Sequence, residues 1–364
     1  MGLTDDLSFE ELGRWKGILG RLFARSDLTA DEARCTMGEV LRGDATPAQI
    51  AAFVTALRMK GETIDEMSGF VRAMLDHAEP LGVAGDLVDT CGTGGDRSSS
   101  INVSTIAAFV VAGAGARVCK HGGRAATSIA GSADVLEALG VVIDLGPEGV
   151  ARCIDEAGMG FCFAPRYHPA MRFAAPVRGE LGVPTVFNFL GPLANPGRAR
   201  FQVVGVSDPA MAETMLGVLA MNGSRRAMVV HGADSLDELS TTGPTDVIEL
   251  LDSGDDGASQ PLASRVRRST VDATDFGMAR VGLEDLRGSD AATNAVIVGE
   301  VLAGGKGPHR DIVVLNAAAG LVVAGLADDW AGGIEMAAAT IDDGRALRVL
   351  QSLIHVSQEG AKTA

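Results

Sequence analysis

A glycine-rich segment between an apolar run and a helix-like stretch constrains the fold of this chain most. Residues 87–89 have the composition of a short strand, and residues 89–96 read DTCGTGGD. Glycine lets the backbone turn tightly and approach a ligand, and the first N–H groups of the next helix carry partial positive charge. A strand, a glycine turn and a helix in this order predict a phosphate cradle.

Two further polar segments lie beside this turn in the predicted fold. Residues 102–105 supply amide and hydroxyl groups before a helix expected at 106–114, where they can cap the helix, bond phosphate oxygens or ligate a hard cation. A cationic run, 120–128, follows a strand expected at 116–119. Loops at the carboxyl ends of neighbouring strands face one crevice. The glycine turn lacks P-loop and dinucleotide-fingerprint spacing, which disfavours nucleotide hydrolysis and hydride transfer.

Capping boxes start successive helices in the N-terminal part of the chain. In each box a Ser or Thr is followed three residues later by Glu or Gln, and each side chain satisfies a backbone donor of the other residue. The pairs are Ser8 with Glu11, Thr29 with Glu32, Thr46 with Gln49, and Thr63 with Glu66. Apolar residues at helical spacing follow these caps. The sequence predicts a lobe of four helices without a strand.

From Leu87 onward, short β-like runs alternate with helical segments. Strands are expected at 87–89, 116–119, 160–163, 201–206, 227–231 and 247–251. Helices are expected at 134–139, 169–181 and 211–221, and again beyond 289, whereas 252–268 predicts an exposed excursion. Such alternation is typical of a mostly parallel sheet flanked by helices. The predicted fold class is α/β, with a small N-terminal helical lobe and a larger α/β lobe.

Charge and cysteine content argue against several classes of protein. The net charge of −16 disfavours a nucleic-acid partner, because phosphate backbones select basic surfaces. The five cysteines are scattered and contain no Cys-x-x-Cys pair, which fits neither a disulfide framework nor a structural zinc site. No secretory signal and no apolar stretch of membrane-spanning length is apparent. We expect a soluble cytoplasmic protein without a membrane or nucleic-acid partner.

Further motifs extend the pattern along most of the chain. They are Lys120, His121, Gly122 and Arg124, and the segments 131–140, 168–171, 176–178, 187–196, 230–232 and 236–240. In this order, and together with the glycine turn, they resemble the anthranilate phosphoribosyltransferase family. Members of this family join anthranilate to the ribose of phosphoribosyl pyrophosphate (PRPP) in tryptophan biosynthesis.

The resemblance implies an architecture as well as an activity. It implies the fold shared with the pyrimidine nucleoside phosphorylases, with the active site in the cleft between two lobes. Residues 1–80 would form the helical lobe, with a mid-chain contribution near 168–196, and residues 81–364 would form the α/β lobe that binds PRPP. Family members are usually homodimers formed through the helical lobe, so we expect a homodimer.

The resemblance also implies roles for individual residues, none of them as an acid or base. The residues expected to hold PRPP are Gly92, Thr93, Gly94, Gly95, Asp96, Asn102, Ser104, Thr105, Lys120 and Ser132. Those expected to hold anthranilate are Gly92, His121, Gly123, Tyr167, His168, Arg178 and Gly191. The expected cofactor is Mg²⁺, with the ligands Ser104, Asp237 and Glu238.

The chemistry of phosphoribosyl transfer gives these roles a physical reason. The departing pyrophosphate gains negative charge, which Mg²⁺ held by carboxylates stabilises. Asp237 and Glu238 follow an expected strand and fit this need, although the usual fate of such a pair is a solvated turn. Asp96 has a similar alternative, because an Asp after glycines commonly closes a turn. Arg178 suits the acceptor, since guanidinium binds carboxylate in a bidentate way.

One position departs from the family pattern. The family's second loop ordinarily reads Lys-His-Gly-Asn-Arg, and this chain has Gly123 at the asparagine position. The change removes a polar contact on the acceptor side and adds backbone freedom. A related phosphoribosyltransferase with a different aromatic or amine acceptor is therefore an alternative.

Two further functions have less support in the sequence. A non-catalytic homologue that binds nucleic acid would need a basic surface and the loss of Asp237 and Glu238, and neither is observed. A nucleoside phosphorylase is compatible with the fold alone. The segment 187–196 and the Asp-Glu pair favour the transferase.

Overall fold

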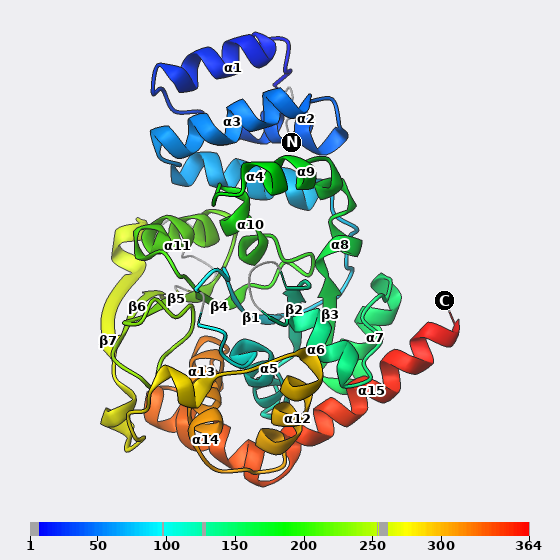
Figure 1. The fold of residues 1–364 in the computed structure, drawn as a ribbon, viewed down its shortest axis with the longest axis vertical. Helices are drawn as coiled ribbons and strands as arrows, with labels where there is room; N and C mark the ends of the chain where they lie inside the picture. Colours follow the sequence, from blue (N-terminus) through cyan, green and yellow to red (C-terminus); the bar gives the residue numbers. More distant parts are fainter. Residues whose placement is uncertain (1–6, 97, 126–128, 253, 255–260, 364) are drawn as a thin grey trace.

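A helical bundle lies at one end of the molecule (Figure 1). Its helices are α1 (Arg14–Phe23), α2 (Ala30–Arg42), α3 (Pro47–Lys60) and α4 (Ile64–Asp76). The computed structural model describes residues 7–96, 98–125, 129–252, 254 and 261–363. The capping boxes at Thr29, Thr46 and Thr63 open α2, α3 and α4, as predicted. Ser8 and Glu11 also exchange their hydrogen bonds, but α1 begins only after the left-handed Gly13, so this box closes a turn.

A sheet of seven strands within the described residues forms the centre of the α/β part. The strands are β1 (Val88–Gly92), β2 (Val118–Gly122), β3 (Met159–Phe163), β4 (Phe201–Gly205), β5 (Arg226–Gly232), β6 (Thr245–Leu250) and β7 (Val266–Val271). Their order is β3-β2-β1-β4-β5-β6-β7, and only the pairs with β6 and β7 are antiparallel. The predicted mostly parallel sheet is confirmed.

Strand β7 was not expected from the sequence. It starts inside the segment 252–268, for which an exposed excursion was predicted, and it forms an edge of the sheet. Its residues from Arg267 to Thr270 are exposed. A strand with little burial shows no alternation of apolar and polar residues, so its pattern resembles that of a loop.

Helices cover both faces of the sheet (Figure 1). The helices α10 (Phe187–Leu193) and α11 (Ala212–Met221) lie between the sheet and the bundle. The other face carries α5 (Val103–Gly113), α12 (Ala291–Leu302), α13 (Pro308–Val323), α14 (Trp330–Asp342) and α15 (Arg345–Thr363). The remaining helices are α6 (Ser132–Ala138), α7 (Pro147–Ala157), α8 (Ala164–Tyr167) and α9 (Ala175–Leu181). Among the described residues, none of these helices is long and apolar enough to cross a membrane.

Neighbouring residues on the central strands contribute to two different apolar cores. Val203 and Val230 belong to the core that contains α5 and α13, whereas Val204 and Val229 belong to the core that contains the bundle and α11. Successive side chains of a strand point to opposite faces, so this parallel sheet is buried on both sides. Residues of the mid-chain segment 168–196 pack into the bundle core. The predicted lobe boundaries themselves stay predictions.

Candidate active site

The carboxyl ends of β1, β2, β4 and β5 meet at one edge of the sheet, because these strands are parallel. The glycine-rich turn leaves β1 at this edge, and the N–H of Thr93 donates to the carbonyl of Gly205 at 2.9 Å. Gly94 and Gly95 have φ angles of 70° and 83°, which residues with a side chain rarely adopt. The shape of the turn therefore requires both glycines.

The acid pair lies against this turn. Oδ2 of Asp237 accepts a hydrogen bond from the N–H of Gly94 at 2.6 Å, and Oε1 of Glu238 accepts one from the N–H of Ser104 at 3.0 Å. A Cβ atom at Gly92 would lie 2.2 Å from Oδ2 of Asp237, so glycine is needed there. Asp237 is only 8% exposed. The pair is part of a packed constellation and is not a solvated turn.

Burial raises the pKa of both Asp237 and Glu238 above the usual range of carboxyl groups. Neighbouring negative charges, including that of Asp96, raise both pKa values further. A cation at these oxygens would stabilise the charged forms. Within the described residues, no group of three or more His, Cys, Asp and Glu side chains is arranged to hold a metal ion. A divalent ion here would complete its shell with a hydroxyl, substrate phosphate and water.

Lys120 brings a buried positive charge to the same place. Its ammonium group donates to the carbonyl of Thr90 at 2.6 Å and to Oγ of Ser104 at 3.4 Å, and the residue is 1% exposed. Oγ1 of Thr90 donates to the carbonyl of Ser104 at 2.9 Å. These contacts join β1 and β2 to the start of α5. The cation, the glycine turn and the acid pair therefore form one constellation.

The start of α5 uses Asn102 differently from one of the roles considered for it. Asn102 occupies the N-cap position of α5 but makes no side-chain capping bond. Its Nδ2 donates to the carbonyl of Ala130 at 3.0 Å, and its Oδ1 accepts from Nδ2 of Asn294 at 3.0 Å. The side chain therefore connects the second loop to α12, and the capping role is wrong.

Other expected donor residues contact protein groups close by. Asp96 accepts hydrogen bonds from the N–H and Oγ of Ser98 at 3.2 and 2.7 Å, so it closes a turn within its own segment. Oγ1 of Thr105 donates to Oγ of Ser132 at 3.0 Å, which joins α5 to α6. The roles of these residues toward PRPP stay predictions.

The second cationic loop carries less free charge than its sequence suggests. Arg124 forms ion pairs with Asp134 at 2.8 Å and Glu137 at 2.9 Å, and both acids belong to α6. Residues 126–128 of this loop lie outside the described residues. Positive charge at the strand ends is therefore provided by Lys120 more than by Arg124.

Two histidines that are expected to hold the acceptor bring β2 against the mid-chain segment. Nδ1 of His121 donates to the carbonyl of Gly191 at 3.1 Å, and Nε2 of His168 donates to the carbonyl of Ala194 at 2.9 Å. The two ring centroids lie 5.1 Å apart. Burial, together with the positive charge that the neighbouring His168 can carry, lowers the pKa of His121 to about 3, so the His121 ring is neutral near pH 7. Its buried Nε2 has no hydrogen-bond partner among the described residues.

Arg178 is the cation that the sequence predicts for the acceptor carboxylate. It lies on α9, its Cζ is 5.6 Å from the ring centroid of Phe187, and burial lowers the pKa of its guanidinium. Within the described part of the chain, its guanidinium has neither an ion-pair partner nor a hydrogen-bond partner. A partly buried, uncompensated guanidinium fits a carboxylate ligand.

Tyr167 and Gly123 occupy contrasting environments. Tyr167 is fully buried, and its hydroxyl donates to the carbonyl of Leu145 at 3.3 Å, so its polar group is already used. Gly123 has space beside it, because a Cβ atom there would have Cβ of Ala164 as its nearest neighbour at 3.9 Å. Gly123 also lies outside the left-handed region. A side chain at position 123 is therefore sterically possible.

Sequence reasoning missed two buried polar residues that support the site. Oδ1 of Asp89 accepts from the N–H of His121 at 3.3 Å, and its Oδ2 accepts from Nδ2 of Asn195 at 2.7 Å. The same Nδ2 donates to the carbonyl of Cys119 at 2.7 Å. These bonds fix the end of β2 to the segment that returns from the mid-chain helices. A charged residue inside an apolar strand was the signal that could have found Asp89.

Comparison with known proteins identifies the family of this chain. Residues 84–347 match the glycosyl transferase family, a/b domain, and residues 16–78 match the helical bundle domain of the same family. The anthranilate phosphoribosyltransferase of Chloroflexus aggregans is 50% identical over 341 residues, which cover 93% of this chain and 97% of that protein. The chain belongs to the anthranilate phosphoribosyltransferase family.

Solved structures of this family have the same fold. The anthranilate phosphoribosyltransferase of Thermus thermophilus aligns with a TM-score of 0.86 at 38% identity, over 94% of this chain and 99% of that one. The enzyme of Saccharomyces cerevisiae, solved in complex with PRPP and Mg, aligns with a TM-score of 0.84 at 26% identity, over 95% of this chain and 98% of that one. The helical bundle and the α/β part thus have counterparts in these family members.

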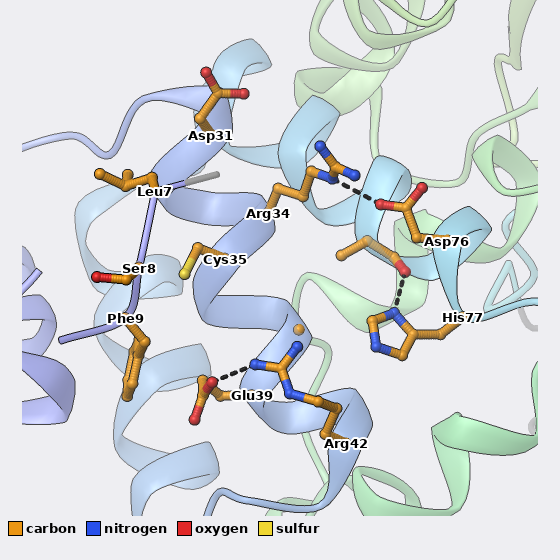
Figure 2. Close-up of a pocket in the computed structure, with 12 residues that line it drawn as sticks. Leu7, Ser8, Phe9, Asp31, Arg34, Cys35, Glu39, Arg42, Asp76 and His77 are labelled. Carbon is orange, nitrogen blue, oxygen red and sulfur yellow. Dashed lines mark hydrogen bonds and ion pairs between the residues drawn. The ribbon is translucent and has the colours of Figure 1, made fainter. Parts of the chain in front are cut away.

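A separate hollow of about 560 Å³ lies in the helical bundle (Figure 2). It is lined by the N-terminal segment, one face of α2 and the end of α4. Its two arginines are paired: Arg34 pairs with Asp76 at 2.7 Å, and Arg42 pairs with Glu39. It shares no residue with the predicted site, and its paired charges make it a weaker candidate than the strand ends.

Proposed function

We propose that this protein transfers the phosphoribosyl group of PRPP to anthranilate, giving N-(5-phosphoribosyl)anthranilate and pyrophosphate, a step of tryptophan biosynthesis. The observation that carries the proposal is the arrangement around β2. Successive residues of a strand point to opposite sides, and Lys120 contacts the cradle residues Thr90 and Ser104, whereas His121 contacts Gly191. A donor site for polyanions therefore adjoins a site for an aromatic acceptor.

In this proposal the donor lies between the glycine turn, the start of α5 and Lys120. The donor residues are those expected from the sequence: Gly92, Thr93, Gly94, Gly95, Asp96, Asn102, Ser104, Thr105, Lys120 and Ser132. Ser104, Asp237 and Glu238 would hold Mg²⁺, which when bound neutralises charge on the departing pyrophosphate. The buried Asp237 and Glu238, whose pKa values are raised, support this assignment, because a cation offsets their repulsion.

The acceptor would bind on the mid-chain side of the site. The uncompensated Arg178 would hold its carboxylate, and Gly123, His121, His168 and Gly191 would surround its ring. Gly92 would lie between donor and acceptor. Tyr167 would contribute through packing, because its hydroxyl is bound to Leu145. Catalysis in this arrangement rests on leaving-group stabilisation and on the orientation of the amine.

A homodimer through the helical bundle is part of the same proposal. Phe23 at the end of α1 is 67% exposed, and Met59 near the end of α3 is 69% exposed. Both line a hollow of about 500 Å³ with Ala52, Thr55 and other residues of α1 and α3. Large apolar side chains grouped on one surface commonly mark a contact between proteins.

One assay tests the proposed reaction. PRPP consumption and pyrophosphate release are measured with Mg²⁺, with and without anthranilate. Consumption that depends on anthranilate supports the proposal. Consumption that appears only with another aromatic amine would favour a changed acceptor, which Gly123 motivates. No consumption with any amine, together with binding to an oligonucleotide, would favour a non-catalytic homologue.

A further inference from the structure

The loop that carries Asp237 and Glu238 has little regular structure of its own. It connects β5, which ends at Gly232, to β6, which begins at Thr245, and contains neither helix nor strand. Its backbone is pressed against the end of β4, because a Cβ atom at Gly205 would lie 1.6 Å from the carbonyl oxygen of Asp237. Without a ladder of strand hydrogen bonds, the position of such a loop depends on contacts from outside it.

Asn316 provides such a contact from α13, on the face of the sheet away from the helical bundle (Figure 1). Its Oδ1 accepts from the N–H of Leu239 at 2.9 Å, and its Nδ2 donates to the carbonyl of Leu239 at 2.8 Å. Nδ2 also donates to the carbonyl of Ile312, one turn earlier on α13, at 2.8 Å. One side chain thus holds both backbone groups of the residue that directly follows Glu238.

Asn316 lies in an otherwise apolar part of α13. It is 3% exposed, in a stretch of α13 from Ile312 to Val323 in which every residue is buried. A buried amide costs free energy unless its polar atoms are bonded, and leucine would fit an apolar helix better. The bonds to Leu239 therefore give the position a specific use beyond packing.

We propose that Asn316 is a positioning residue: by holding the backbone of Leu239, it fixes the position of Asp237 and Glu238 relative to the glycine turn. The proposal rests on the proposed metal role of the acid pair. Without Asn316, the N–H and carbonyl of Leu239 are buried and unpaired, and the loop moves to find other partners. A shift of the carboxylates then weakens the binding of Mg²⁺ with PRPP, as the loss of an outer partner commonly does at metal sites.

The test compares Asn316→Leu with a matched control, Thr340→Val. Leucine has the same branching at Cγ but a larger volume, and it removes all the bonds of Asn316. Thr340 on the neighbouring α14 is equally buried and donates only to the carbonyl of Met336, away from the loop that carries Asp237 and Glu238. Asn316→Ala is the second variant, since its smaller side chain excludes steric crowding as the cause of any effect.

Calorimetric titration of PRPP, with and without Mg²⁺, gives the first readout. In both Asn316 variants we expect PRPP affinity without Mg²⁺ to stay within about twofold of the wild-type value, and the tightening caused by Mg²⁺ to fall by about tenfold or more. Thr340→Val should keep the wild-type tightening. A loss of stability in the Asn316 variants with undiminished Mg²⁺-dependent tightening would overturn the proposal.

Hydrogen–deuterium exchange gives a readout that does not depend on metal. Peptides covering residues 233–244 should exchange faster in the Asn316 variants than in the wild type and in Thr340→Val. Unchanged exchange in this loop would overturn the positioning role of Asn316 even if activity falls. A wild type whose PRPP affinity does not respond to Mg²⁺ would count against the metal role of the acid pair, and the exchange of the loop would then decide the role of Asn316.

Discussion

Oδ2 of Asp237 accepts a hydrogen bond from the backbone N–H of Gly94 at 2.6 Å, so the acid loop and the glycine-rich turn touch directly. One N–H group cannot fully serve a carboxylate and a phosphate oxygen at the same time. If Gly94 holds PRPP as proposed, Asp237 must turn toward a cation when the donor binds. Donor and metal binding are then coupled through these two residues.

Replacing the acid pair should separate activity from stability. In Asp237→Asn/Glu238→Gln we expect almost no turnover, because the ligands of the metal are lost. The pKa values of both acids are raised in the folded protein, so they bind protons more tightly than in the unfolded chain, and stability falls as pH rises above about 4. The side chains of Asn and Gln do not titrate, so the double variant lacks this decline of stability with rising pH. The variant should therefore be at least as stable as the wild type at pH 7 in urea unfolding.

The chain offers a matched control for this experiment. Glu284 and Asp285 form an exposed acid pair between two leucines, as Asp237 and Glu238 do in the buried loop. Glu284→Gln/Asp285→Asn should leave turnover within about twofold, since exposed acids contribute little. Near-normal turnover in the Asp237 and Glu238 double variant would show that the pair has no part in the reaction.

Arg178→Ala should weaken the use of anthranilate and spare the donor. The expected loss in kcat/KM for anthranilate corresponds to a charged hydrogen-bond pair, roughly 1.5 to 3 kcal/mol. Arg172→Ala is the control, because Arg172 is an exposed arginine close by that stacks on Phe173. Steady-state kinetics with each substrate varied in turn measures the effect. Equal losses for both substrates would mark Arg178 as a structural residue.

Local signals explain why much of the fold could be predicted. A capping box such as Thr29 with Glu32 acts within one helical turn, so the sequence alone locates the helix start. The expected helix at 169–181 is instead a 3-10 turn, Pro169–Phe173, followed by α9. Pro176 lies in the first turn of α9 and lacks the N–H that a continuous helix needs at that position.

The candidate site was visible in the sequence only where its residues form motifs. The adjacent acids after β5 and the glycine turn could be recognised in this way. Asp89 and Asn316 could not, because their partners Asn195 and Leu239 lie 106 and 77 residues away along the chain. Contacts between such distant residues depend on tertiary packing, which periodicity and spacing do not encode.

His121 should make the protein more sensitive to acid. Its pKa falls from 6.5 to about 3 on folding, mainly through burial, so below pH 6.5 the unfolded chain binds a proton that the folded protein excludes. Stability contributed by the neutral ring is therefore lost as pH falls from about 6.5 toward 3. Urea unfolding from pH 7 to pH 4.5 should show a decline steeper than that of His121→Gln by up to about 1.4 kcal/mol per pH unit. Parallel curves would show that His121 titrates normally.

Gly123→Asn tests the position at which this chain departs from its family. The backbone at Gly123 lies outside the left-handed region and the nearest atom to an added Cβ is 3.9 Å away, so asparagine should be accommodated without strain. If anthranilate is the native acceptor, the variant should use it equally well or better, by at most about 0.5 to 1.5 kcal/mol, the worth of one hydrogen bond.

A different native acceptor would give the opposite pattern in the same kinetics. The wild type would then use anthranilate poorly, because the space beside Gly123 would serve another ring or substituent. Gly123→Asn would gain sharply with anthranilate and lose the other acceptor, since the new amide fills that space. Side-by-side values of kcat/KM with anthranilate and ring-substituted analogues separate the two cases. Efficient use of anthranilate by the wild type eliminates the changed acceptor, whatever the variant does.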